Sequence, residues 1–327
     1  MKRRDFIVLL GGAATMRPLM ALAQKAPIVI GFLGSQAPPP PKDAQGSAIA
    51  QGFLENGLVE GRDYVFEQPR FTGGDDERFP ELARELAQKN VRIIITNTPA
   101  GVRAAQRLDP PVSVIMTNMN DPVGAGLIAS LAHPGNHTTG TASLNEDVTP
   151  KLLEFVREIV PTASVLAVLF NPRNPTNPVM VDVLRAKAEP FGITVFPFAL
   201  TSPDELEAAF ATLAVRRPDA IQIISDPRTS DLGNRIAALA IAHRLPTFSN
   251  NLVFVEAGCL MSYSASLRKI LRRTGYYVKR ILDGANAGEL PVEQPTGLEL
   301  FINLKTAKAL GIEIHATLLA RADQVIE

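Results

Sequence analysis

The sequence predicts an α/β protein of two lobes, each a doubly wound parallel sheet, joined by a hinge. Three observations lead to this prediction. Short apolar runs alternate with amphipathic helical patterns along the chain, which is the order of a parallel sheet covered by helices. The alternation restarts after residues 143–149. The chain, at 327 residues, is also longer than one hydrophobic core usually covers.

The first half is expected to hold strands at 28–33, 91–96 and 112–117 and helices at 44–56, 78–90, 101–107 and 124–131. The strands are short runs rich in branched apolar residues. The helix at 78–90 has the clearest pattern, because its apolar residues recur at i, i+3, i+4 and i+7 and therefore share one face: Phe79, Leu82, Ala83 and Leu86.

The second half repeats this order. We expect helices at 150–160, 178–191, 203–215, 231–243 and 266–282 and strands at 164–170, 193–199, 220–225 and 259–263. Ser202 followed three residues later by Glu205 forms a capping-box sequence, so it predicts the start of the helix at 203–215.

The first residues have the anatomy of an export signal. Arg3 and Arg4 precede a short apolar run at 6–20, and Ala21-Leu-Ala23 is a small-x-small cleavage pattern. The paired arginines favour the twin-arginine route, with an ordinary secretory signal as the alternative. We therefore expect residues 1–23 to be a signal peptide and the mature protein to work in the periplasm.

The charge balance and the cysteine content narrow the class of protein and the kind of partner further. The 33 basic and 33 acidic residues balance, and no basic block suggests a nucleic-acid partner. Cys259 is the single cysteine, so no internal disulfide is possible, and we expect its thiol in the core. No cysteine follows the signal, so the usual lipid attachment point of a bacterial lipoprotein is missing.

Catalytic patterns are weak, so we expect neither an enzyme, nor a cofactor, nor a metal. The four histidines lack metal-ligand spacing. Gly124-Ala-Gly126 fits the dinucleotide pattern loosely, but it begins several residues beyond its strand instead of in the turn. Two alternatives stay open: a dinucleotide-dependent enzyme on the same two-lobe fold, and a ligand-sensing domain, although the chain has no N-terminal helix-turn-helix.

Polar residues follow nearly every predicted strand, at 34–36, 96–98, 117–122, 171–175, 225–227 and 262–264. In open parallel sheets, ligands bind beyond the carboxyl ends of the strands. The same residue types also make turns and helix caps, which is the alternative explanation for each cluster. Their occurrence on both halves nevertheless indicates a small-molecule site between the lobes.

Several motifs together resemble one family. They include Gly-Phe-Leu-Glu-Asn-Gly-Leu-Val-Glu-Gly-Arg-Asp-Tyr64, Asp121-Pro-Val-Gly, Leu131-Ala-His-Pro-Gly-Asn-His, Asn171-Pro-x-Asn-Pro and Phe301-Ile-Asn-Leu-Lys-Thr-Ala-Lys-Ala-Leu-Gly. The chain resembles the ABC-transporter substrate-binding proteins that include the tryptophan/tyrosine-type binding proteins. The resemblance covers essentially the whole chain.

This resemblance implies a type I periplasmic-binding fold with three crossovers and a ligand in the interlobe cleft. It divides the chain into 27–142 plus 265–297 for one lobe and 143–264 plus 298–327 for the other. It also implies an ABC permease as partner, and we expect a monomer. Mapped by motif, the ligand-binding residues would be Ser35, Thr98, Asp121, Ser143, Asn171, Asn174, Asp226 and Tyr263.

The expected ligand carries a carboxylate, as an amino acid or an aromatic acid does. We expect this group near Ser35 and Thr98, with Asp121 or Asp226 pairing with an ammonium or accepting from a hydroxyl. An acidic residue in the cleft therefore favours a zwitterion or a polyol. The alternative is that both aspartates only cap turns. The chain has no tryptophan, so an apolar wall would come from other rings: Phe32, Phe170, Phe254 and Tyr263.

Overall fold

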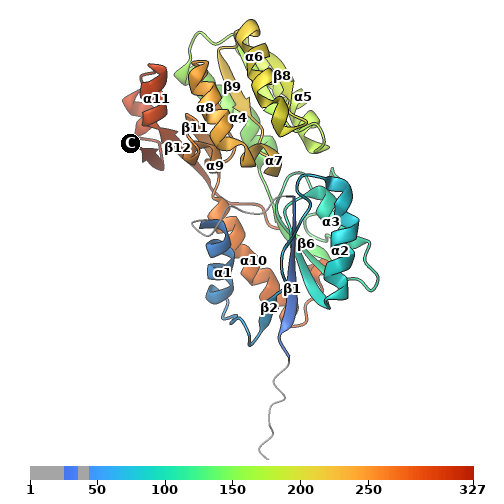
Figure 1. Cartoon of the computed structure of the whole chain (residues 1–327). Helices are drawn as coiled ribbons and strands as arrows, with labels where there is room; N and C mark the ends of the chain where they lie inside the picture. Colours follow the sequence, from blue (N-terminus) through green and yellow to red (C-terminus); the bar gives the residue numbers. More distant parts are fainter. Residues whose placement is uncertain (1–25, 36–43) are drawn as a thin grey trace, which may run out of the picture.

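The computed structural model describes residues 26–35 and 44–327, which form two lobes (Figure 1). We call the lobe with the N-terminal strand lobe 1 and the other lobe 2. The sheet of lobe 1 has the order β2-β1-β4-β5-β6, with β3 also beside β1, and all its strand pairs are parallel. Its strands are β1 (Ile28–Gly34), β2 (Tyr64–Phe66), β3 (Arg70–Phe71), β4 (Val91–Thr96), β5 (Ser113–Met119) and β6 (Thr138–Ala142).

Helices cover both faces of the lobe 1 sheet. α2 (Phe79–Gln88) and α3 (Pro99–Gln106) pack on one face, and α1 (Ala44–Glu55) and α10 (Leu267–Leu282) on the other. The four residues predicted to share the face of α2 are all buried, which confirms that pattern. α10 is distant in sequence but lies beside α1 in Figure 1.

The contact between α1 and α10 depends on two glycines. A Cβ on Gly52 would lie 2.0 Å from the Arg272 carbonyl oxygen, and one on Gly275 would lie 2.1 Å from the Gly52 oxygen. Real atoms do not approach so closely, so only glycine lets the two helix backbones touch here. This contact fixes the returning helix to lobe 1.

The sheet of lobe 2 has the order β13-β12-β11-β10-β9-β7-β8. Its pairs are parallel except β11 with β12, which is antiparallel. Its strands are β7 (Val165–Phe170), β8 (Thr194–Ala199), β9 (Ala220–Ile223), β10 (Thr247–Ser249), β11 (Met261–Ala265), β12 (Leu298–Asn303) and β13 (Gln324–Ile326). Its helices are α4 (Asn145–Ile159), α5 (Thr176–Ala188), α6 (Leu206–Arg216), α7 (Pro227–Asp231), α8 (Gly233–Ala242), α9 (Leu252–Glu256), α11 (Leu304–Leu310) and α12 (Ala316–Leu319).

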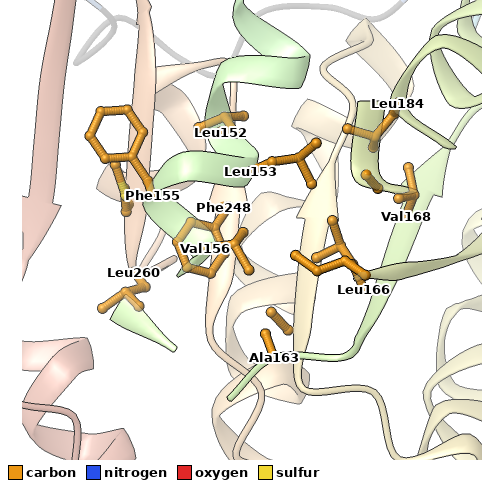
Figure 2. Packing of buried hydrophobic residues seen from close by; sticks show 14 of the residues in the cluster. Leu152, Leu153, Phe155, Val156, Ala163, Leu166, Val168, Leu184, Phe248 and Leu260 are labelled. Atoms are coloured by element: carbon orange, nitrogen blue, oxygen red, sulfur yellow. The ribbon is translucent and has the colours of Figure 1, made fainter. Parts of the chain in front are cut away.

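The larger core of lobe 2 lies between its sheet and α4 and α5. Figure 2 shows Leu152, Leu153 and Val156 of α4 in this core, together with Leu166 of β7 and Leu184 of α5. A second core covers the opposite face with α6, α8 and α9. Burial of the sheet on both faces explains why β7 is a continuous apolar run instead of an alternating one.

The chain crosses between the lobes three times within the described residues. It enters lobe 2 between β6 and α4, returns between β11 and α10, and enters lobe 2 again before β12. We propose the division 27–142 plus 265–297 and 143–264 plus 298–327 for the two lobes. The predicted fold class, two α/β lobes with mainly parallel sheets, is confirmed.

Some predicted elements are wrong. Residues 124–131 form turns instead of a helix, because Gly126 has a φ of 66° and the Leu127 amide bonds back five residues, to the Pro122 carbonyl, instead of four. α4 begins at Asn145, earlier than the predicted start at Pro150. β6 was not predicted, since its sequence Thr-Thr-Gly-Thr-Ala is not an apolar run.

Other details agree with the sequence. Ser202 and Glu205 form the expected capping box. Cys259 is fully buried in lobe 2, and burial raises the pKa of its thiol to about 12.

Among the described residues, no helix has the length and apolar character needed to cross a membrane. The predicted signal peptide at 1–23 lies outside the described residues.

Candidate ligand-binding site

A cleft of about 500 Å³, counting the part that opens to solvent, lies between the two lobes. The described residues of its lobe 1 wall are Ser35, Asp76, Thr98, Pro99, Ala100 and Arg103. Those of its lobe 2 wall are Asn171, Arg173, Asn174, Pro175, Asp226, Pro227 and Arg228.

The lobe 1 wall is built at the ends of β1 and β4. Thr98 is the N-cap of α3, and its hydroxyl accepts a hydrogen bond of 3.0 Å from the Gly101 amide. Pro99 follows at the first helical position, where its missing N–H costs nothing. Ser35 follows β1 and is buried, and its carbonyl accepts from the Thr72 hydroxyl.

The lobe 2 wall is centred on the carboxylate of Asp226. Its Oδ1 accepts from Asn171 Nδ2 at 2.9 Å and from the Arg228 amide at 3.0 Å, and its Oδ2 accepts from Asn174 Nδ2 at 2.8 Å. Asp226 also caps α7 in a reciprocal pair with the Thr229 hydroxyl. The loops after β7 and β9 are thus held together by one buried carboxylate.

Arg228 connects the two walls. Its Nη2 donates to the Gly74 carbonyl of lobe 1 at 2.6 Å, and its Nη1 donates to the Thr201 carbonyl of lobe 2 at 3.2 Å. The side chain is 9% exposed. A second contact between the lobes joins Asn120 Nδ2 to the Met180 sulfur at 3.2 Å.

Asp76 faces these groups from lobe 1. Burial raises its pKa, and the negative charge of Asp226 raises it further, whereas the charges of Arg228 and Arg173 lower it. Asp76 therefore lies within electrostatic reach of the lobe 2 wall.

The cleft brings together five of the eight residues expected to bind ligand: Ser35, Thr98, Asn171, Asn174 and Asp226. Their direct contact with a ligand stays a prediction. For Asp226 the structure adds that its oxygens already accept three hydrogen bonds from the protein.

The other three predicted residues lie outside the described lining of this cleft. Asp121 has a φ of 34°, and its Oδ1 accepts from the Gly124 amide at 2.7 Å, as expected of a turn-capping aspartate. Ser143 lines a smaller hollow near the crossovers and donates to Asn120 Oδ1. Tyr263 packs against Phe155 with ring centroids 5.2 Å apart.

The expected aromatic wall is also absent from the described lining. Phe254 is fully buried in the core of lobe 2, and Phe170 packs against the other core of that lobe. Phe32 pairs with Phe71 inside lobe 1. The apolar lining consists instead of small residues: Pro99, Ala100, Pro175 and Pro227.

Sequence reasoning missed four charged residues of the cleft: Asp76, Arg103, Arg173 and Arg228. The sequence offered a signal for two of them, since Arg173 lies in the polar loop at 171–175 and Arg228 directly follows the one at 225–227. Arg103 follows Thr98 by five residues, inside α3. Guanidinium groups such as these can pair with a carboxylate through two parallel N–H donors. Within the described residues no group of three or more histidine, cysteine or acidic side chains is placed to hold a metal.

Comparison with known proteins agrees with this architecture. Residues 40–326 match the family described as ABC transporter substrate binding protein. A tyrosine-binding protein of Clostridioides difficile is 27% identical over 229 residues, or 70% of this chain; the alignment spans 65% of that relative's length.

Two solved structures share the fold. A conserved domain protein of Vibrio cholerae is 25% identical, with a TM-score of 0.80 over 91% of this chain and 99% of the other. A Streptococcus pneumoniae ABC domain in complex with L-Trp is 23% identical, with a TM-score of 0.81 over 92% and 100%. The expected type I periplasmic-binding fold is confirmed, and the chain belongs to the ABC transporter substrate-binding protein family.

Proposed function

We propose that this protein is the periplasmic solute-binding component of an ABC importer and that it captures a small carboxylate-bearing ligand. The observation that carries this proposal is the cleft between two α/β lobes, with arginines on both walls. Arginine binds carboxylates through paired N–H donors. The relatives described as binding tyrosine and L-Trp support an amino acid or an aromatic acid as the ligand.

Ligand capture would close the lobes about the crossover segments. A ligand that touches both walls binds the closed form better than the open form, so it shifts the equilibrium toward closure. We propose that the protein delivers this ligand unchanged to a membrane permease and acts as a monomer, without a cofactor.

A thermal-shift screen of amino acids, aromatic acids and neutral sugars tests the ligand class. A ligand at 100 times its dissociation constant adds about 2.7 kcal/mol to the stability of the folded protein. We expect carboxylates to raise the melting temperature and to reduce the radius of gyration in small-angle scattering. A response to sugars alone would contradict the carboxylate proposal, and nucleotide-dependent turnover without closure would favour the enzyme alternative.

A second experiment tests export. Changing Arg3 and Arg4 to Lys should trap the precursor in the cytoplasm if the twin-arginine route is used. Arg17→Lys is the matched control, because it alters an arginine of the same segment outside the pair. Normal export of the double variant would leave an ordinary secretory signal.

A further inference from the structure

Among the described residues, the cleft arginines Arg103, Arg173 and Arg228 make no ion pair with a carboxylate. Arg103 gives one hydrogen bond to the Ala125 carbonyl, and Arg228 gives its two to backbone carbonyls. Each guanidinium has five N–H donors, so most remain available to a bound anion.

The acidic residues of the cleft are poorly placed to receive an ammonium group. The carboxylate of Asp226 is occupied by two asparagine amides and one backbone amide. An ammonium that approached it would have to compete with these donors. Most of the roughly four acceptor positions of a carboxylate are therefore in use.

Asp76 is the other acid of the described lining, and two cations oppose an ammonium there. The positive charges of Arg228 and Arg173 act on its carboxylate, against the negative charges of Asp226 and Asp75. A ligand ammonium bound to Asp76 would enter the field of these two guanidinium groups, and like charges at such range repel. With three guanidinium groups against two carboxylates, the described lining carries a net positive charge.

Resting on the proposed function, we propose that the cleft selects an organic acid without an ammonium group, such as a hydroxy, oxo or dicarboxylic acid, over the amino acid of the same skeleton. Such a ligand presents only anionic and neutral groups to the arginines of the two walls. Its hydrocarbon part then meets the small apolar lining instead of a stacked ring.

Calorimetric titration of matched pairs tests this selectivity. Each pair differs by the ammonium group: succinate with aspartate, 2-oxoglutarate with glutamate, and phenyllactate with phenylalanine. In any pair that binds, we expect the dissociation constant of the organic acid to be lower by about tenfold or more, the factor that corresponds to 1.4 kcal/mol. An amino acid that binds as tightly as its partner, or more tightly, overturns the inference. If no carboxylate of any kind binds, the proposed function itself fails.

Three variants separate the charge effects from the fold. Arg173→Met removes an exposed cation whose side chain makes no hydrogen bond among the described residues, so it should weaken organic-acid binding about tenfold without altering the melting temperature. Arg92→Met is the matched control, because Arg92 is exposed near the start of β4, at the opposite end from the cleft, and it should bind like the parent protein.

Asp76→Asn should change the binding affinity in opposite directions for an organic acid and for an amino acid. If the ligand is an organic acid, removing this negative charge should tighten binding severalfold. If Asp76 instead receives an ammonium, the same variant would weaken binding, and that result would overturn the inference.

Discussion

The two walls of the cleft are built differently. On lobe 2, Asp226, Asn171 and Asn174 hold one another in a closed hydrogen-bond network that joins two strand-end loops. On lobe 1, Thr98 makes a single local bond to Gly101 at the start of α3. A wall whose side chains are already fixed loses less conformational freedom when a ligand binds. The difference indicates that lobe 2 offers the more ordered half of the site, and we propose that lobe 1 closes on it.

The largest expected effect comes from removing the centre of the lobe 2 network. Asp226→Ala leaves two buried or half-buried amides without an acceptor and removes the N-cap of α7, so it should destabilise the protein by about 3 kcal/mol. Urea denaturation measures this change. Asp226→Asn is the matched control: it keeps the cap but faces Asn174 with a second donor, and it should cost less. Equal losses in the two variants would contradict a network centred on the carboxylate.

The lobe 1 wall should respond less. Thr98→Ala removes one N-cap bond from α3, which typically costs about 1 kcal/mol. Thr98→Ser retains the hydroxyl and should be close to the parent protein in the same urea experiment. If Thr98→Ala costs as much as Asp226→Ala, the two walls are equally ordered and the comparison between them is wrong.

The sequence predicted the parts of the fold that depend on local pattern. β7 is a continuous apolar run, β4 is rich in branched apolar residues, and α2 has a clear apolar face, so period and propensity identify them. β6 escaped because its polar residues become strand only through pairing with β5. The helix predicted at 124–131 failed because the positive φ of Gly126 is decided by the turn it completes.

The candidate site was likewise predicted only in those parts that depend on position along the chain, and not in those that depend on tertiary contacts. Strand-end position identified Asn171 and Asp226, since the carboxyl ends of parallel strands meet at one edge. The mutual bonding of these two residues, 55 positions apart, is a tertiary fact that spacing does not encode. Arg103 and Arg228 were missed for a related reason: a long side chain reaches a site several ångströms from its backbone, so its position in the sequence does not reveal where its charge lies.

The smallest expected effect on stability comes from Asp231, whose carboxyl group is affected by the negative charge of Asp226 at the other end of α7. Partial desolvation of its carboxyl and the negative charge of Asp226 together raise the pKa of Asp231 to about 6, although the positive charge of Arg228 opposes the shift. Since this folded-state value exceeds the ordinary 3.8, the folded protein binds more protons than the unfolded chain between about pH 4 and 6. Stability from this group is therefore present at low pH and is lost as the pH rises through that window.

Asp231→Asn should remove this loss and raise the free energy of unfolding at pH 7. Because the residue is exposed at the end of its helix, solvent screening limits the gain to less than about 1 kcal/mol. At pH 4, where the parent carboxyl in the folded protein is largely protonated, the variant and the parent should unfold at nearly the same urea concentration. A gain of equal size at both pH values would mean that the effect comes from helix propensity or packing. A loss at pH 7 would show that the Asp231 charge supports the lobe 2 wall, since its attraction to Arg228 would then outweigh its burial and its repulsion by Asp226.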